Sequence, residues 1–374
     1  MRSLIAAIAL LLAGLASAQQ LTLPPDGDNQ HSTVTQNLGL VSVTIDYHSP
    51  DVHAPDGKDR RGNIWGKLVP YGVIDEAFGT CSQCPWRAGA NENTTFTVSH
   101  DVKIEGQPLP AGKYGLQMIA GPEEWTIIFS KNNHSWGHYY YDPAEDQLRV
   151  KVKPQKSEYH EWLTYEFTDR DLDHATAALK WEDLEVPWNI NVDNMTDLYI
   201  AALRQDLRME AGFQWEGWER AARYAIGQKR ASEAVEFATN AAGLRFIGEE
   251  NFRTLSTLAD AQELAGKTAD AAVSREKALN HPTASVGDLH TYARQLQNAG
   301  KKEEALRVFE LNAKKHPNAW PVNAGLARGY SAVGRYKDAL KYAKLALAQA
   351  PDDQNKKFLQ DAITKLEAGK DMNV

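Results

Sequence analysis

Long hydrophobic runs, an excess of positive charge and the familiar hydrolase motifs are all missing from most of this sequence. After the first twenty residues, no stretch approaches the roughly 18 consecutive apolar residues of a membrane-spanning helix. The formal net charge of −8 at pH 7 argues against a nucleic-acid partner, which would bind a basic surface. Neither a Gly-x-Ser-x-Gly nor a His-Glu-x-x-His signature occurs. These absences predict a soluble protein, and no motif indicates a particular reaction.

The first 18 residues have the pattern of a signal peptide. Arg2 supplies a positive charge, the apolar stretch LIAAIALLLAGL follows, and the small residues 16–18 form a cleavage site. We expect cleavage near Ala18, with the mature chain beginning at Gln19. No cysteine stands just after that site, which argues against a lipoprotein anchor. The chain is therefore predicted to be exported, to the periplasm or out of the cell.

Cysteine is scarce as well, because Cys81 and Cys84 are the only two in the chain. In an oxidising compartment such a pair usually forms a disulfide. Closing so short a loop contributes about 2 kcal/mol in the chain-entropy model, enough to shape a turn but not to hold a domain together. A redox centre is one alternative. A zinc site is another, with His134 and His138 as further ligands if their segment is an extended strand. We favour the structural disulfide and expect neither a metal nor another cofactor.

The length of 374 residues favours two domains, and the residue pattern changes after residue 190. Residues 19–36 are predicted to form a polar linker. Over residues 37–190, short alternating apolar runs separated by polar turns predict an antiparallel β-sandwich or jelly-roll-like domain. In the first run, one face carries Val41, Val43, Ile45 and Tyr47.

Residues 193–374 are rich in alanine, leucine and charged residues and contain a 34-residue repeat. Three sets of residues follow this step: Gly266, Gly300 and Gly334; Ala259, Ala293 and Ala327; and Ala271, Ala305 and Ala339. Such a period is typical of stacked pairs of antiparallel helices, in which the glycine forms the turn and the alanines allow close approach. The pattern resembles the tetratricopeptide repeat. We expect a degenerate earlier repeat around Ala234 and a C-terminal capping helix around Leu359 and Leu366.

The motifs WRAGANE (residues 86–92) and LPAGKYGL (residues 109–116) occur in order in the front half. They resemble a bacterial family, the domain-of-unknown-function family 2911, over about residues 40–190. The resemblance implies an exported domain without an established activity. The family's positions of interest correspond to Lys67, Pro70, Trp86, Arg87, Gly89, Asn91, Glu92, Gly115, Trp136 and Gly137. The cysteines lie in a segment, residues 73–85, that departs from the usual family pattern.

Arg87, Asn91 and Glu92 are the main candidates for a binding site in the front half. An arginine can hold a carboxylate or a phosphate through two parallel hydrogen bonds. A partly buried glutamate can act as a general base. An internal ion pair that fastens the 73–85 segment to the sheet is the structural alternative. Further candidates for the same region are Lys67, Asp46, His48, His134, His138 and the aromatic Trp136.

Two functions are compatible with these features. The first is a binding or scaffold protein, in which a groove of the helical repeats holds a protein or peptide and the β domain holds a small ligand or glycan. Candidate groove residues are Tyr292, Gln295, Asn323 and Arg328. The second is an envelope-associated hydrolase with a site around Arg87, Asn91 and Glu92, in which Asp142 could serve as a second acid. We favour binding without catalysis.

Overall fold

A computed structural model describes residues 29–54 and 56–374 of the chain. The predicted signal peptide and most of the predicted linker lie outside the described residues. The chain divides into two compact units between Met195 and Thr196. We call them the β unit and the helical unit. Within the described ranges, no helix has both the length and the apolarity that a membrane crossing requires.

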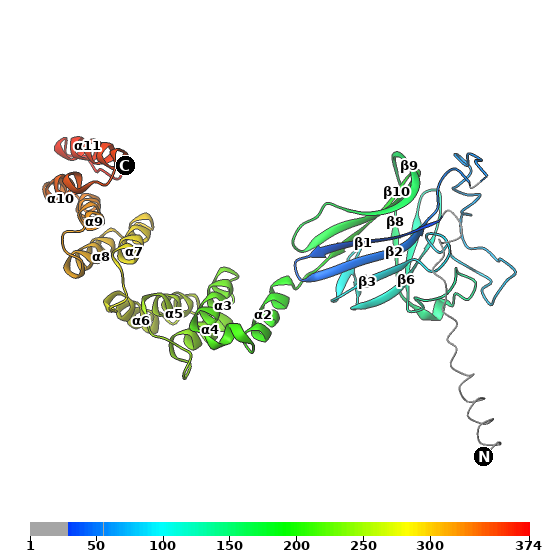
Figure 1. The fold of residues 1–374 in the computed structure, drawn as a ribbon, viewed down its shortest axis with the longest axis horizontal. Coiled ribbons are helices and arrows are strands. Elements are labelled where there is room, and N and C mark those ends of the chain that lie inside the picture. Colours follow the sequence, from blue (N-terminus) through cyan, green and yellow to red (C-terminus); the bar gives the residue numbers. More distant parts are fainter. Residues whose placement is uncertain (1–28, 55) are drawn as a thin grey trace, which may run out of the picture. The chain divides into compact units, whose positions relative to one another are not determined.

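The β unit consists of two antiparallel sheets (Figure 1). The first sheet has the strand order β1-β2-β3-β6-β7-β8, with β1 (Gln30–Leu38), β2 (Val41–Ser49), β3 (Thr95–Val98), β6 (Gly112–Ile119), β7 (Trp125–Ser130) and β8 (Asp146–Val152). The second has the order β5-β4-β10-β9, with β4 (Val102–Ile104), β5 (Gln107–Leu109), β9 (Gln155–Thr168) and β10 (His174–Asn191). A short 3₁₀ helix, η2 (Pro143–Glu145), precedes β8.

The core of the β unit lies between the two sheets. Strand β2 alternates between buried and partly exposed residues, and the four apolar residues predicted to share a face are all buried. The ring of Tyr47 packs edge-on against that of Tyr165 from β9, with the ring centres 4.8 Å apart. Trp125 of β7 and Trp181 of β10 are also buried, and Trp65 packs edge-on against both. These contacts confirm the predicted antiparallel sandwich.

Two details of the β unit differ from the sequence-based expectation. Residues 30–36, predicted to be linker, belong to β1, which pairs with β2 along its whole length. Residues 175–181 and 184–188, two of the short apolar runs expected to form separate strands, belong to the single 18-residue strand β10. Its register shifts around Glu182, which has a left-handed backbone with φ of 56°. An irregularity of this kind kinks a strand without ending it.

The helical unit is built from pairs of antiparallel helices that follow one another along the chain (Figure 1). It begins with α2 (Met195–Asp206) and the 3₁₀ helix η3 (Glu210–Phe213). The first helix of each pair is α3 (Trp215–Gly227), α5 (Phe252–Leu264), α7 (Val286–Asn298) or α9 (Trp320–Ala332). The second is α4 (Ala231–Gly243), α6 (Thr268–Asn280), α8 (Lys302–Lys315) or α10 (Tyr336–Gln349), and α11 (Asp353–Glu367) completes the unit.

The repeated residues have the positions that the 34-residue period predicts. Gly266, Gly300 and Gly334 lie between the helices of three pairs, with φ of 72°, 80° and 78°. The repeated alanines are all buried, as is Ala234 in the earlier pair. The apolar residues Leu359 and Leu366 of α11 are buried too, as expected of a capping helix. The predicted helical-repeat architecture is therefore confirmed.

Candidate functional site

A cavity of about 380 Å³ opens in the β unit beside Arg87. We call it the Arg87 cavity. Its volume lies in the range of small-molecule sites. One part of its lining is apolar and includes Leu68, Val69, Pro70, Ile74, Trp86 and Trp181. The polar part includes Asn29, Arg60, Glu76, Arg87, Asn91 and His138.

The WRAGANE segment forms part of the cavity wall by a strained path. Trp86 first pairs with Met118 of β6 through two backbone hydrogen bonds of 2.8 Å. The chain then turns, with left-handed backbone at Ala88 (φ 52°) and Asn91 (φ 57°). Asparagine tolerates this conformation, but it costs an alanine roughly 1 kcal/mol. Strain of this kind persists only where the surrounding structure enforces it, and it is frequent at functional sites.

Hydrogen bonds from the core enforce that turn. The buried hydroxyl of Tyr165 donates to the carbonyl oxygen of Ala88 at 2.7 Å, and the Thr94 hydroxyl donates to the same oxygen at 3.0 Å. A Cβ atom on Gly89 would lie 2.6 Å from the Thr94 hydroxyl oxygen, so this position requires glycine. The core of the sandwich therefore fixes the backbone on either side of Gly89.

Arg87 has a guanidinium group without an acidic partner. One nitrogen donates to the carbonyl oxygen of Asn91 at 2.9 Å and another to the Tyr139 hydroxyl at 3.4 Å. The guanidinium also lies over the Tyr139 ring, 5.5 Å from its centre. No carboxylate of the described chain forms an ion pair with it. Both oxygens that hold Arg87 are uncharged, so no carboxylate lies within ion-pair distance of its guanidinium, although Glu76 lines the same cavity.

His138 is the second polar group of note in the cavity. It is 4% exposed, and its Nε2 atom lies 3.2 Å from a carboxylate oxygen of Glu76. Its Nδ1 atom is buried and has no hydrogen-bond partner. Burial and the nearby charge of Arg87 lower the pKa of His138 more than Glu76 raises it. The imidazole is therefore neutral near pH 7, and with a proton on Nε2 toward Glu76 its Nδ1 is a free acceptor.

The other front-half candidates lie away from this pair. Glu92 contacts His48, with 3.3 Å between a carboxylate oxygen and Nδ1, and does not pair with Arg87. Lys67 is exposed and donates to the side chain of Asn63 at 2.6 Å. The structure therefore does not contain an ion pair between Arg87 and Glu92, which was the structural alternative for these residues. Neither Glu92 nor Lys67 lines the Arg87 cavity.

The segment from His134 to His138 is not an extended strand. Apart from an isolated bridge at Trp136 it forms turns, so the two histidines do not share a strand face. His134 is exposed beside Asn133, whereas His138 is buried. The Trp136 side chain is 58% exposed, and it too lies outside the lining of the Arg87 cavity.

Cys81 and Cys84 form a disulfide, as predicted. Both are buried and pack against Ile128 of β7 and Tyr141. The disulfide therefore fixes the 73–85 segment against the first sheet, and Cys84 also lines the Arg87 cavity. With the sulfurs bonded to each other, they are not free to bind zinc together with the histidines. Over the described ranges, no group of three or more His, Cys, Asp or Glu residues is placed to hold a metal ion.

The carboxylates suggested for hydrolysis have other partners. Asp142 accepts a hydrogen bond from the backbone of Ala144 and caps η2. It lines a different hollow from Arg87, together with Cys81 and Arg149. Glu92, as described, contacts His48. Neither side chain lines the Arg87 cavity, which gives the hydrolase alternative no support.

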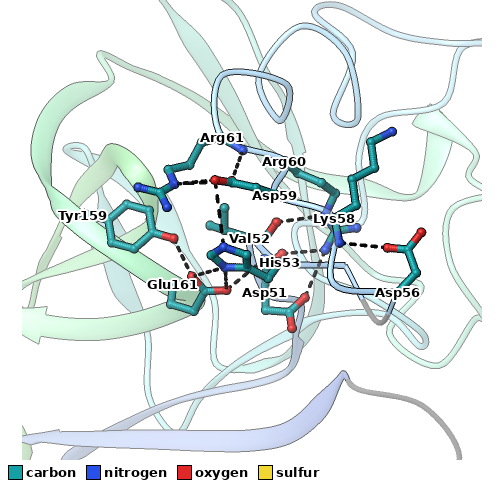
Figure 2. A network of polar contacts seen from close by, with 10 residues as sticks. All are labelled: Asp51, Val52, His53, Asp56, Lys58, Asp59, Arg60, Arg61, Tyr159 and Glu161. Atoms are coloured by element: carbon teal, nitrogen blue, oxygen red, sulfur yellow. Dashed lines mark hydrogen bonds and ion pairs between the residues drawn. The ribbon is translucent and has the colours of Figure 1, made fainter.

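A polar network holds the 51–61 segment against β9, next to the cavity (Figure 2). Glu161 of β9 accepts hydrogen bonds from Tyr159 and from the backbone and Nδ1 of His53. Burial opposes ionisation of Glu161, but these hydrogen bonds outweigh it and lower its pKa to about 2. In the same segment, Arg60 pairs with Asp51 at 3.0 Å. Arg60 also lines the cavity, so the network helps to position its wall.

The structure places the candidate groove residues of the helical unit in different environments. Asn323 of α9 is buried, and its amide donates to Gln349 of α10 at 2.8 Å, so it is a packing residue within its pair. Tyr292 lies against Arg275 of α6. Gln295 is exposed, and Arg328 is half-buried.

Sequence reasoning did not find Arg60, Glu76 or Trp181 as cavity residues. They come from three separate segments, and no local pattern links them to Arg87. Glu76 does lie in the segment that departs from the family pattern, so that segment contributes a residue to the site as well as a disulfide.

Comparison with known proteins agrees with the resemblance noted in the sequence. Residues 29–190 match the model of a family described as "Protein of unknown function (DUF2911)". The DUF2911 match runs from the start of β1 to Ile190 near the end of β10 and includes every residue of the Arg87 cavity. No curated protein matches this chain.

Several solved structures of repeat proteins are similar to part of the chain. One is the crystal structure of MamA, with 16% identity and a TM-score of 0.29, covering 42% of this chain and 88% of MamA. Another is YrrB, titled a TPR protein with an unusual peptide-binding site, with 17% identity and a TM-score of 0.29, covering 45% of this chain and 84% of YrrB. These similarities are weak, and the repeat architecture stands on the chain's own helix pairs.

Proposed function

We propose that this chain is an exported two-part binding protein. Its β unit binds a small molecule with an anionic group in the Arg87 cavity, and its helical unit holds a segment of a protein partner. The observation that carries the first half is the guanidinium of Arg87, which has no ion-pair partner at the wall of a partly apolar cavity. A positive charge in such a place is stabilised by a negatively charged ligand.

The lining indicates the chemistry of that ligand. Arg87 offers donors for a carboxylate, and the partly exposed Glu76 carboxylate in the same lining offers an acceptor for a hydroxyl or amine of the same molecule. Trp86, Leu68 and Pro70 provide apolar contact. A compact carboxylic acid with a hydrogen-bond donor and an apolar portion fits this combination. A neutral glycan would leave the charge of Arg87 uncompensated.

The repeat architecture supports the second half of the proposal. Stacked helix pairs present the first helices side by side, and such surfaces commonly bind extended segments of other proteins. Export is supported by the signal-like pattern of residues 1–18 and by the Cys81–Cys84 disulfide. The proposal extends to the domain division, with a β domain that begins at β1 and ends near residue 190, followed by the repeats over residues 193–374.

Thermal shift measurements with a panel of small carboxylic acids and their methyl esters test the ligand proposal. At 100 times its Kd, an acid that binds should raise the unfolding temperature of the β unit by about 5 °C. Its ester should have little effect. Arg87→Gln should abolish the response, whereas Arg170→Gln, at an exposed position outside the cavity, should retain it. Equal responses to acids and esters, or a full response in Arg87→Gln, would refute the proposal.

A further inference from the structure

Two half-buried arginines lie on neighbouring first helices of the helical unit, and neither has an acidic partner. Arg294 belongs to α7 and Arg328 to α9, 34 residues apart and thus at the same position of successive repeats. Each directly follows one of the buried repeat alanines, Ala293 or Ala327. Over the described ranges, no ion pair involves either arginine.

This pair is an exception among the arginines of the helical unit. Seven others have a carboxylate partner: Arg204, Arg223, Arg230, Arg253, Arg275, Arg307 and Arg335. Three more, Arg208, Arg220 and Arg245, are exposed and accessible to water. Arg294 and Arg328 have neither full exposure nor a counter-charge. Burying a charge without a partner is costly, so two such arginines side by side are suited to binding an anionic group.

The surroundings of the pair are also incompletely hydrogen-bonded. The Nε atom of Arg294 and the Nδ1 atom of His290 on α7 are buried and have no hydrogen-bond partner. Burial and the charge of Arg294 lower the pKa of Arg328 to about 10. Burial and both arginines lower the pKa of His290. The two guanidinium groups therefore lie close enough to repel each other, and bound carboxylates would offset both charges.

An apolar surface adjoins the arginines. The guanidinium of Arg328 lies over the ring of Phe358 from α11, 4.5 Å from its centre, and Phe358 is 37% exposed. The charged and apolar groups thus come from three successive helices of the same layer, α7, α9 and α11. A ligand that contacts all of them must be extended across the repeats, as a peptide segment is.

We infer that Arg294 and Arg328 bind neighbouring acidic side chains of an extended segment in a partner protein, with an apolar residue of that segment on Phe358. The inference rests on the proposed protein-binding function of the helical unit. Carboxylates fit because two guanidinium groups a repeat apart offer separate two-pronged donors. Charge complementarity selects an acidic segment over a basic or neutral one.

Fluorescence anisotropy on the intact protein tests this inference. The probe is a labelled dodecapeptide with an amidated C-terminus, two adjacent glutamates at its centre and a leucine three residues later. We expect saturable binding that weakens as salt rises and is lost when both glutamates are replaced by glutamine. The double variant Arg294→Gln/Arg328→Gln should bind about tenfold more weakly or worse. Arg307→Gln, at an exposed ion pair on α8, serves as the matched control and should bind like the wild type.

Unfolding and partner capture complete the test. Without peptide, the double variant should unfold at the same temperature as the wild type or higher, because it removes two unpaired charges. A lower unfolding temperature, binding that is insensitive to the glutamates, or dependence on a free C-terminal carboxylate would each overturn the inference. Capture of identical partners from a periplasmic extract by wild type and double variant would overturn it while sparing the proposed function. If neither the wild type nor the double variant captures any partner, the proposed protein-binding function itself is refuted.

Discussion

Lys229 has a backbone conformation that normally belongs to glycine. It lies between α3 and α4 with φ of 58°, five residues before the buried Ala234. Gly266 stands in the equivalent place of the next pair, five residues before Ala271. We predict that Lys229→Gly stabilises the helical unit by about 0.5–1 kcal/mol, because glycine adopts left-handed backbone without strain. Urea unfolding followed by helix circular dichroism measures this change.

A nearby lysine provides the control for that substitution. Lys267 precedes α6 with φ of −86°, outside the left-handed region. Lys267→Gly should therefore destabilise the unit slightly, since it only adds freedom to the unfolded chain. A stabilisation of equal size at both positions would show that the backbone conformation of Lys229 is not the cause.

At Gly137, both the backbone conformation and a close contact with Arg87 oppose the addition of a side chain. Its φ is 63°, and a Cβ atom there would lie 3.1 Å from the guanidinium carbon of Arg87. Gly106, between β4 and β5, has φ of 78° and open space around it. In both alanine variants the backbone strain alone should lower the free energy of unfolding by about 1 kcal/mol. The loss should be larger for Gly137→Ala because Arg87 must move. Equal losses in thermal unfolding would contradict a tight contact between Gly137 and Arg87.

At the level of elements, a buried carboxylate joins two helix pairs. Glu219 of α3 is fully buried and forms ion pairs with Arg223 of the same helix and Arg253 of α5. Thr257 of α5 also donates to it at 3.0 Å. Burial opposes the charge, but the hydrogen bonds from Arg253 and Arg223 outweigh burial and lower the pKa of Glu219. One side chain therefore connects successive first helices.

We predict that Glu219→Gln destabilises the helical unit by about 2–3 kcal/mol, less than for a fully buried pair because both arginines can reach water. Since the pKa of Glu219 is lower in the folded state, its contribution is complete above the unfolded value of 4.5 and declines as the pH falls below it. The difference between wild type and variant should therefore shrink between pH 7 and pH 3. Chemical denaturation at several pH values measures it, and a constant difference would contradict the linkage.

The sequence allowed the helices to be predicted better than the first strand. The 34-residue period recurs in chemically distinct residues, and a helical repeat depends on contacts near in sequence. Strand β1 reads QHSTVTQNL, in which Val34 is the only apolar residue before Leu38, so hydrophobic alternation does not reveal it. It is held by backbone pairing with β2, which a pattern of side chains does not record.

The site was predictable only in part, for a reason that concerns the whole β unit. Arg87 and Asn91 were found because an unusual motif carries them, and they do line the cavity. Glu92, next to them in sequence, contacts His48 instead, because the left-handed turn at Asn91 redirects the chain. Trp181 and Arg60 reach the cavity from positions far along the chain. Their proximity depends on the packing of the two sheets and has no local signature.

At the scale of the whole molecule, the two compact units have separate cores and should unfold separately. We predict two thermal transitions, one followed mainly by tryptophan fluorescence, since seven of the ten tryptophans belong to the β unit, and one by helix circular dichroism. Gly137→Ala should lower the midpoint temperature of the β-unit transition only, and Glu219→Gln that of the helical-unit transition only. The double variant should show both shifts at full size, because distant sites without shared partners are additive. A single transition that both substitutions lower would instead mean that the cores of the two units unfold as one cooperative structure.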